Sequence, residues 1–388
     1  MRMTAFSFSS SKSKPIAIVD IQSGSVSIAI GILHGDKPLE IVAVGRSDLS
    51  FEDRSPEATI AALADQIDEA GKKALTAYAE LQKTHGPVVH TFAIINTPWA
   101  HSQTICTVSK SDTEVLVTEH MIADLAKRAL NESTEIDTSN LLEANVVRIE
   151  LNGYVTTEPS GKHAHKISVY SLVSSCTATV RTIVDNGLQK LFSAPITYRS
   201  QLRAIVSVIE ALPGIAKDYC LIDITRDSAI IANIHVGRSM GHGAINEGLL
   251  SIVRRISGKK MPEETLALLR MVADDTCSTD ACAAIIEATA RTEPELVRAF
   301  AEPMVELAAV RYLPPTLILV CEDALSHWLS ELFSRIDFTQ FTITTRPFNV
   351  VLFNATTLDH LVATAPSIAI GQRLMLAAAL VQIEERQT

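Results

Sequence analysis

Residues 16–33 read IAIVDIQSGSVSIAIGIL, and this stretch decides how the rest of the chain is interpreted. Two apolar runs flank a short polar turn, Gln22-Ser23-Gly24-Ser25, a pattern typical of a β-hairpin. One carboxylate, Asp20, lies inside the first apolar run. An unpaired buried charge is costly, so this position predicts a partner for Asp20. A phosphate with its metal ion, held by the hairpin's backbone N–H groups and by this carboxylate, would be such a partner.

Composition favours an α/β protein. Of the 388 residues, 47% are hydrophobic and only 5% aromatic, so Ala, Val, Ile and Leu are expected to build the cores of two or three domains. A formal net charge of −10 argues against nucleic-acid binding.

The longest apolar run near the end, LMLAAALV, is too short to span a bilayer, and the N-terminus lacks a secretory pattern. We therefore expect a cytoplasmic protein without a direct membrane anchor, whose six cysteines are mostly buried thiols.

A second hairpin pattern occurs about half a chain later. Residues 218–237, DYCLIDITRDSAIIANIHVG, again show an apolar strand, an aspartate, a short polar turn and an apolar strand. Asp20 and Asp223 hold equivalent places, which predicts a duplicated α/β fold with a ligand between its halves. Between the two hairpins, residues 89–167 alternate strand, helix and strand patterns, as expected of a small inserted subdomain.

The ordered set of motifs resembles the actin-like ATPase superfamily, and within it the bacterial FtsA/PilM branch. The resemblance rests on the two phosphate-type hairpins, VDIQSGSVSIAI and IDITRDSAIIANI, and on the insert between them. It looks nearer to the FtsA family, because LNGYVTTEPSGKHAHKISV and the segments from GHGAINEGLLSIVRRI to PEETLALLR keep that family's order. The resemblance covers roughly residues 15–385.

This resemblance implies an α/β, actin-like (ribonuclease H-like) two-lobe fold with an inserted small α+β subdomain. The first lobe would comprise 15–88, 168–205 and 366–388, the second lobe 206–365, and the partner-binding insert 89–167, after a flexible tail at 1–14. The implied ligand is ATP with Mg²⁺, and its absence is an open alternative. The implied metal ligands are Asp20 and Asp223. The nucleotide contacts carried over from the family fall on Asp20, Gln22, Ser23, Gly24, Ser25, Asp223, Thr225, Ser228, Glu247, Gly248, Cys321 and Glu322.

Departures from the family pattern put nucleotide chemistry in doubt. Gln22 stands where the first hairpin usually has glycine, and the second turn, 224–228, has no glycine at all. Near the C-terminus a Gly-Gly pair is replaced by Glu322-Asp323. Glycine lets backbone approach a phosphate closely, whereas each carboxylate repels one by ~4 kcal/mol at an effective dielectric near 20. We therefore expect slow or absent hydrolysis.

These patterns favour the first of three functions, and the other two are alternatives. The first is an FtsA-like cytoskeletal adaptor in cell division that engages a division filament through the insert and is able to self-associate. The second is a PilM-like platform for type IV pilus or secretion assembly that binds a peptide of a membrane protein, which would recruit the chain to the inner face of the membrane. The third, from another class, is a small-molecule kinase of the same superfamily.

Several other residues have simpler interpretations. Arg226-Asp227 is expected to be an exposed ion pair in the turn, worth little. His163 and His165 are expected in a surface loop rather than at a metal, because no acidic or Cys cluster accompanies them in sequence. Trp99 and Phe92 are expected in a core rather than on a partner surface.

Overall fold

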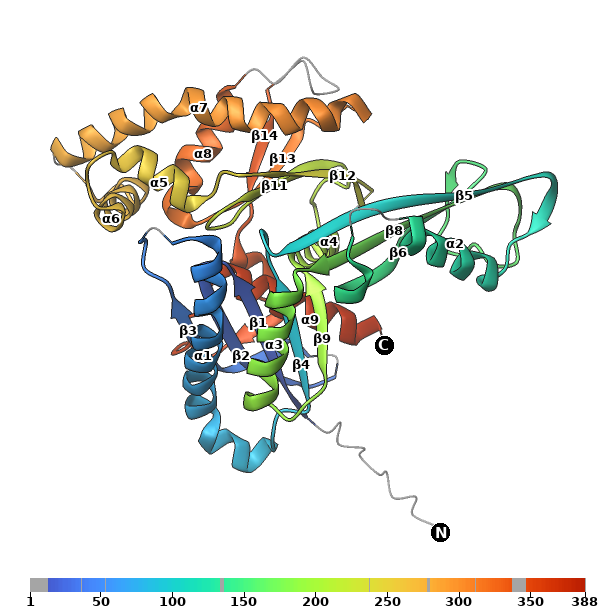
Figure 1. Cartoon of the computed structure of the whole chain (residues 1–388), viewed down its shortest axis with the longest axis horizontal. Helices are drawn as coiled ribbons and strands as arrows, with labels where there is room; N and C mark the ends of the chain where they lie inside the picture. Colours follow the sequence, from blue (N-terminus) through green and yellow to red (C-terminus); the bar gives the residue numbers. More distant parts are fainter. Residues whose placement is uncertain are drawn as a thin grey trace, which may run out of the picture.

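The computed structural model describes residues 13–35, 37–52, 54–132, 136–236, 238–277, 280–310, 312–336 and 347–387. The expected tail at 1–14 falls largely outside these residues, although Lys14 already belongs to the first strand. Figure 1 shows two lobes stacked on one another and an arm that projects sideways from them. Each of these three parts is built on its own β-sheet.

The first lobe contains a six-stranded sheet in the order β15-β3-β2-β1-β4-β9. The opening hairpin forms as predicted, with Asp20 paired opposite Ser27 in the antiparallel ladder. Nearly every residue of its two strands is buried, because helices cover both faces of the sheet. The strands of this sheet are β1 (Lys14–Gln22), β2 (Ser25–Leu33), β3 (Leu39–Asp48), β4 (His90–Ile95), β9 (Ile196–Ser200) and β15 (Val362–Thr364).

The second lobe repeats this arrangement with five strands in the order β12-β11-β10-β13-β14. In each lobe three consecutive antiparallel strands are followed by two strands that run parallel to the first of them. The second hairpin therefore occupies the place of the first, which confirms the duplicated two-lobe fold. Its strands are β10 (Tyr219–Ile224), β11 (Ala229–His235), β12 (Arg238–Ile245), β13 (Thr316–Val320) and β14 (Asn349–Leu352).

Helices cover both sheets. The longest helix of the first lobe has Pro56 as its first residue and Ser55 as its N-cap, and the Ser55 side chain accepts a hydrogen bond from the Ala58 amide at 3.2 Å. It lies so close to β3 that a Cβ on Gly45 would stand 2.0 Å from the Ala70 carbonyl oxygen, so only glycine fits there. The helices of the first lobe are α1 (Pro56–His85), α3 (Ala178–Leu191), α4 (Gln201–Ala211) and α9 (Gln372–Gln387). Those of the second lobe are α5 (Leu249–Ser257), α6 (Pro262–Ala273), α7 (Asp280–Val310) and α8 (Asp323–Arg335).

The two lobes share one hydrophobic core. Helices α4 and α9 pack on each other, and their buried faces join residues of both sheets, such as Ile18 of β1 and Leu221 of β10, into one cluster. Helix α9 begins at Gln372, and its run from Leu374 to Gln382 is buried. The relative orientation of the lobes is therefore fixed by an apolar core as well as by polar contacts.

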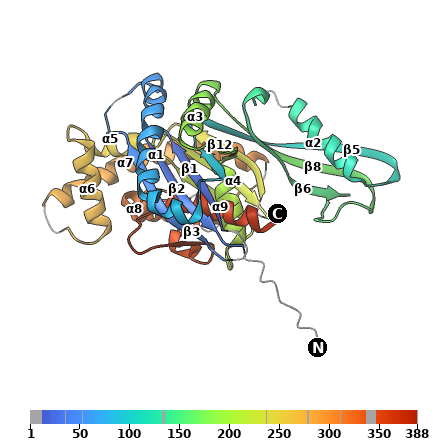
Figure 2. The same cartoon turned by 90° about the horizontal axis from the view of Figure 1, so that it is seen from below.

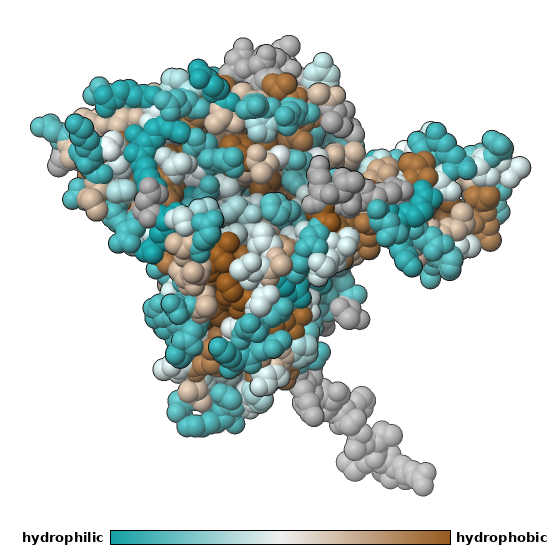
Figure 3. Space-filling model, in the orientation of Figure 1, coloured by the Kyte–Doolittle hydropathy of each residue, from teal (hydrophilic) through white to brown (hydrophobic). Residues whose placement is uncertain are grey.

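The projecting arm is the insert (Figure 2). Its four strands lie in the order β5-β8-β6-β7, and helix α2 packs on one face over a small core that contains Leu125, Leu151 and Val169. The space-filling view shows the same arm standing clear of the two lobes (Figure 3). Its elements are β5 (Ala100–Leu116), α2 (Glu119–Glu132), β6 (Leu141–Leu151), β7 (Tyr154–Val155) and β8 (His163–Cys176).

Some strands lie on the other side of the expected domain boundaries. The segment 89–99 was assigned to the insert, yet β4 pairs with β1 in the first sheet. Strand β8 continues past 167 to Cys176, because it forms the centre of the insert sheet. Strand β15, expected in the second lobe, pairs with β3 of the first. Alternating apolar patterns indicate strands without indicating which sheet they join.

Two pairs of residues with simpler interpretations lie outside the hairpins. Trp99 and Phe92 are 5% and 6% exposed and pack in the first lobe, so they are core residues as expected. His163 and His165 are exposed but lie on β8 rather than in a loop. Among the described residues no group of three potential metal-ligating side chains occurs, and no helix is long and apolar enough to cross a membrane.

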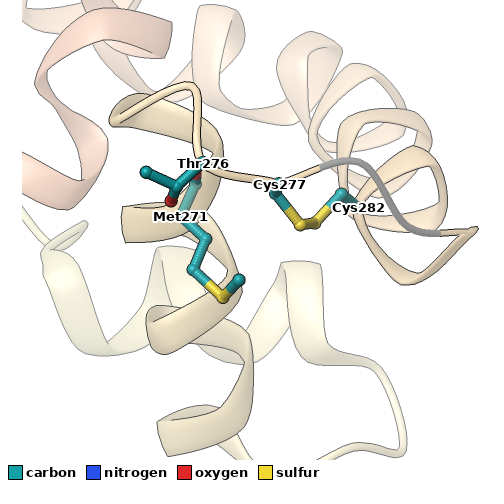
Figure 4. Close-up of a disulfide and its surroundings, with 4 residues drawn as sticks. All are labelled: Met271, Thr276, Cys277 and Cys282. Carbon is teal, nitrogen blue, oxygen red and sulfur yellow. A yellow bond between two sulfur atoms is a disulfide. The ribbon is translucent and has the colours of Figure 1, made fainter.

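The cysteines follow the expectation only in part. Cys176, Cys220 and Cys321 are buried thiols, whereas Cys106 is exposed. Cys277 and Cys282 are joined by a disulfide that ties the segment after α6 to the first turn of α7 (Figure 4). Spacing of five residues carries no recognised signal, so the sequence did not reveal this pair.

Candidate functional site

Both hairpin turns border one cleft between the lobes. This cleft has a volume of about 350 Å³, and its walls include Gln22, Gly24 and Ser25 from the first hairpin with Ile224 and Thr225 from the second. It therefore lies where the sequence placed a ligand site between equivalent turns.

Asp20 is buried beside this cleft and is fully engaged by neutral donors. It is 1% exposed, and it accepts hydrogen bonds from the Gln22 side-chain amide at 2.6 Å and from the Asn96 amide at 2.8 Å. Burial raises the pKa of Asp20, although these two amides and the charge of Arg373 act against that rise. Asp20 is therefore a buried, hydrogen-bonded carboxylate and not a solvated one.

Asp223 is also 1% exposed, and its partner is a cation supplied by the protein itself. The Arg373 guanidinium, from the first turn of α9, donates to Asp223 Oδ1 at 2.7 Å and to the Ile224 carbonyl at 2.7 Å. Burial alone lowers the pKa of Arg373, but the negative charges of Asp223 and Asp20 outweigh it and raise this pKa. The positive charge of one guanidinium thus interacts favourably with both equivalent aspartates.

Arg226, in the second turn, spans the cleft to the first lobe. Its guanidinium donates to the carbonyl oxygens of Leu49 at 2.8 Å and Ser50 at 2.7 Å. The stem lies over the first turn so closely that a Cβ on Gly24 would stand 1.8 Å from Arg226 Cδ. The side chain is only 12% exposed, and its approach to Asp227 is a loose 3.8 Å. The expectation of an exposed ion pair within the turn is therefore wrong, because the carbonyl groups of the other lobe bind Arg226 instead.

The second turn is closed on itself and on the helix that follows. Both the amide and the hydroxyl of Thr225 donate to the Ser228 carbonyl at 2.8 Å. At the start of α5, the Leu249 and Leu250 amides donate to the Thr225 and Arg226 carbonyl oxygens at 2.9 and 2.8 Å. Helix N-terminal amides that could bind a phosphate are thus already used by the turn.

Glu247 and Gly248, which were also expected to contact the nucleotide, lie outside the cleft. Gly248 packs against the second turn, where an added Cβ would stand 2.5 Å from the Arg226 carbonyl oxygen. Glu247 accepts from Ser251 Oγ at 2.7 Å and from Arg255 at 2.6 Å. Neither residue is among those that line the cleft.

The turn after β13 closes the other end of the cleft. Glu322 forms an ion pair with Arg270 of α6 at 3.1 Å, and both side chains line the opening. Cys321 is buried behind them, and burial raises the pKa of its thiol to about 12. The backbone here carries side chains where the family pattern has a glycine pair.

These residues do not fit a nucleotide with its metal ion. Both oxygens of Asp20 and the Oδ1 of Asp223 already accept hydrogen bonds. Arg373 also places its positive charge beside the carboxylates that a metal ion would need as ligands. Arg226 fills the space over Gly24 that a phosphate would take. Ser23 is 1% exposed and Ser25 5%, so both lie in the packed turn.

A second, larger concavity lies where the insert meets the first lobe. This groove has a volume of about 700 Å³. Its apolar walls come from the insert sheet, from α4 and from α9, and they include Val146, Leu172, Leu202, Val206, Leu380 and Ile383. Arg203, Glu210, Lys217 and Glu384 add charges among these apolar residues. Tyr219, at the start of β10, also lines the groove, so the second lobe contributes to its wall.

Strand β6 presents an open edge in this region. Its pairing with β7 covers only Glu150 and Leu151, and no strand in the described parts of the chain pairs with that edge between Glu143 and Arg148. Val146 and Val147 of this stretch line the groove. An unpaired edge beside an apolar groove is able to accept an extended segment as an added strand.

Solved structures show how this architecture compares with known proteins. PilM in the PilM–PilN type IV pilus biogenesis complex aligns over 96% of this chain and 98% of its own, at 12% identity and a TM-score of 0.58. The chain has the actin-like ATPase fold. A ROK family transcriptional regulator, homologous to the E. coli MLC protein, aligns over 96% of this chain and 78% of its own at 13% identity and a TM-score of 0.40. A Bacteroides thetaiotaomicron protein of actin-like ATPase fold and unknown function aligns over 90% and 95% at 9% identity and a TM-score of 0.36. No family model and no curated protein matches the sequence.

Within the actin-like fold, sequence reasoning missed Arg373 and the groove. A signal for Arg373 was present, since it is the only charged residue between His360 and Glu384 and it precedes a wholly apolar run. A lone cation at the start of a buried helix predicts a buried anionic partner. The groove had no such signal, because its walls come from segments far apart in the chain.

Proposed function

We propose that this actin-like protein is a platform that binds a short peptide segment of a membrane-anchored partner, as part of pilus or secretion assembly, and that it does so without nucleotide turnover. The groove between the insert and the first lobe is the observation that carries this proposal. The likeness to PilM over nearly the full length of both chains supports it, since that protein was solved with its assembly partner PilN.

The chemistry of the groove supports an extended, partly apolar ligand. Apolar side chains such as Val206, Leu172 and Ile383 would receive alternate side chains of an added strand, while the open edge of β6 would bond its backbone. Arg203 and Glu384, paired with each other at 2.9 Å, form a rigid charged border. Backbone pairing supplies affinity here and the apolar subsites supply specificity.

A cell-division adaptor of the FtsA type is the second candidate. The same fold and the same projecting insert support it, and self-association through exposed lobe surfaces would be part of that role. The two candidates differ in the partner, which is an inner-membrane pilus or secretion protein in the first and a division filament in the second. A small-molecule kinase is less well supported, because the interlobe cleft does not fit a nucleotide with its metal.

The groove can be blocked without disturbing the core. Ser207 of α4 lines the groove and is partly exposed, so Ser207→Trp would fill the space with an indole. Ser334→Trp is the matched control, because Ser334 is an exposed helical serine on α8 that does not line the groove. A photo-crosslinking residue at Val146 would report directly on what enters.

The tagged chain is captured from crosslinked membranes of the organism that encodes it, and partners are identified by mass spectrometry. We expect crosslinks from Val146 to the cytoplasmic segment of a pilus or secretion protein, loss of that protein with Ser207→Trp, and retention with Ser334→Trp. A synthetic peptide of the crosslinked segment should then bind the parent chain in solution. Recovery of a division filament would favour the second candidate, and equal capture by both tryptophan variants would refute the groove as the binding site.

A further inference from the structure

We infer that Arg226 and Arg373 take over, within this chain, the space and the charge that a nucleotide and its metal supply in this fold, and that they hold the two lobes closed without any ligand. This inference concerns the interlobe cleft and does not depend on what binds in the groove.

Arg373 acts as a resident cation. Two buried aspartates face a large desolvation cost unless a positive charge lies near them. The guanidinium bonds Asp223 and its charge also acts on Asp20, so one side chain serves both lobes. Its position in the first turn of α9 is unfavourable for a cation, because the positive end of the helix dipole lies there. The two carboxylates offset that cost.

Arg226 acts as a strut across the cleft. It leaves the second lobe at the turn after β10 and ends on two backbone carbonyl oxygens, those of Leu49 and Ser50, in the segment after β3. Its guanidinium also lies 5.2 Å from the ring centre of Phe51, within the range of a cation–π contact. Hydrogen bonds from a charged donor are stronger than neutral ones, so this strut is a specific link between lobes.

Further contacts fix the same segment of the first lobe. Arg254 donates to the Phe51 carbonyl at 3.0 Å, and the Phe51 amide donates to Glu263 at 3.3 Å. The Leu49 amide donates to the Gly24 carbonyl at 2.8 Å, which ties the segment to the first turn. Residues 49–51 are therefore held between their own hairpin and three side chains of the second lobe.

A nucleotide would have to displace this arrangement. A divalent metal ion at the aspartates would bring a second cation beside Arg373, and phosphates would collide with the Arg226 stem over Gly24. Closure of the lobes is consequently a property of the chain itself. The shape of the groove, which is bordered by both lobes, is then independent of any nucleotide.

The first test is binding by the full chain. Purified protein is titrated with Mg-ATP and with Mg-ADP, read out by calorimetry and by the melting temperature. We expect no heat of binding and no change in melting temperature at millimolar concentrations. A rise in melting temperature that Asp20→Asn abolishes would overturn the inference.

The second test gives a positive signal. Hydrogen exchange is compared for the parent, Arg226→Ala and the control Arg291→Ala, whose side chain is 71% exposed on α7. Loss of two charge-assisted bonds should speed exchange of the Leu49–Phe51 amides and of the first turn by roughly 10- to 100-fold, with the insert unchanged. Arg226→Lys should fall between, because one ammonium cannot match the guanidinium fork. Unchanged exchange at these amides in Arg226→Ala would overturn the inference even if no nucleotide binds.

Discussion

Replacement of Arg373 by methionine tests how strongly the resident cation stabilises the chain. Methionine keeps much of the apolar stem but removes the guanidinium. Asp223 then remains buried without its partner at Oδ1, and its Oδ2 has no hydrogen-bond partner among the described residues even in the parent. The Ile224 carbonyl also loses its donor.

The size of the effect follows from burial. Asp223 is 1% exposed and Arg373 12%, so the pair is largely withdrawn from water. Removing one partner of such a pair typically costs about 3–5 kcal/mol, because a buried charge is left uncompensated. An unfolding entropy of about 2.1 cal/mol/K per residue corresponds to about 1.2 °C per kcal/mol for a chain of 388 residues, so the melting temperature should fall by roughly 4–6 °C.

The assay is thermal unfolding of three variants beside the parent. Arg373→Met should show the full loss, whereas Asp223→Asn combined with Arg373→Met should recover most of it, because no buried charge then remains. Arg291→Met, at an exposed site, should stay within about 0.5 kcal/mol of the parent. A single variant as stable as the parent, or a double variant no more stable than the single, would refute the role given to Arg373.

Three further predictions concern other parts of the structure. Burial raises the pKa of Asp20 above its ordinary value of 3.8. The ionised carboxylate therefore destabilises the folded state fully at pH values above the raised pKa and no longer does so below 3.8. Asp20→Asn should raise the melting temperature at pH 7, and this gain should shrink as the pH falls towards 4. Gly248→Ala should destabilise the chain by about 1–3 kcal/mol in denaturant unfolding, because the nearest atoms to the new Cβ are all backbone atoms. Gly241→Ala is the control and should cost less, because the nearest atom to its new Cβ is the end of a leucine side chain 3.2 Å away. Glu143, buried at the base of the insert, accepts hydrogen bonds from the Ser200 amide at 3.0 Å and from its hydroxyl. Glu143→Ala should cost about 1–3 kcal/mol for each of these groups left without an acceptor, and it should speed hydrogen exchange where β6 meets the first lobe.

The hairpins and the duplication could be predicted because they depend on local patterns. An apolar run, an aspartate and a short polar turn at 16–33 and again at 218–237 indicate two equivalent strands and two equivalent carboxylates. Helix α1 was likewise predictable from its Ser55-Pro56 start. Each of these signals lies within about ten residues of the feature that it specifies.

The partners of the two aspartates could not be predicted in the same way. Arg373 lies 150 residues from Asp223 in the chain, and Arg226 reaches Leu49 across a sequence separation of 177. Side-chain contacts of this range depend on the packing of α9 and on the angle between the lobes, which no local pattern encodes. Reading Arg226 with its neighbour Asp227 was therefore a reasonable inference from the sequence and an incorrect one.

The two halves of the duplication provide different partners for their buried aspartates. In the first, Asp20 is satisfied by the neutral amides of Gln22 and Asn96, and Gln22 stands where the family pattern has glycine. In the second, Asp223 is satisfied by a charge from α9. Both Gln22 and Arg373 line the cleft between the lobes.

Closure by the chain's own side chains has a consequence for the groove. Its walls include Leu202 of α4 and Leu380 of α9, but also Tyr219, which moves with the second lobe. A hinge between the lobes would therefore widen or narrow the groove. Contacts that keep the lobes fixed without a ligand keep this surface in one shape, so a peptide would meet a preformed site and lose less free energy to ordering. Arg226→Ala should accordingly weaken peptide binding at the groove although Arg226 does not line it, and unchanged affinity would show that the shared core of α4 and α9 fixes the lobes by itself.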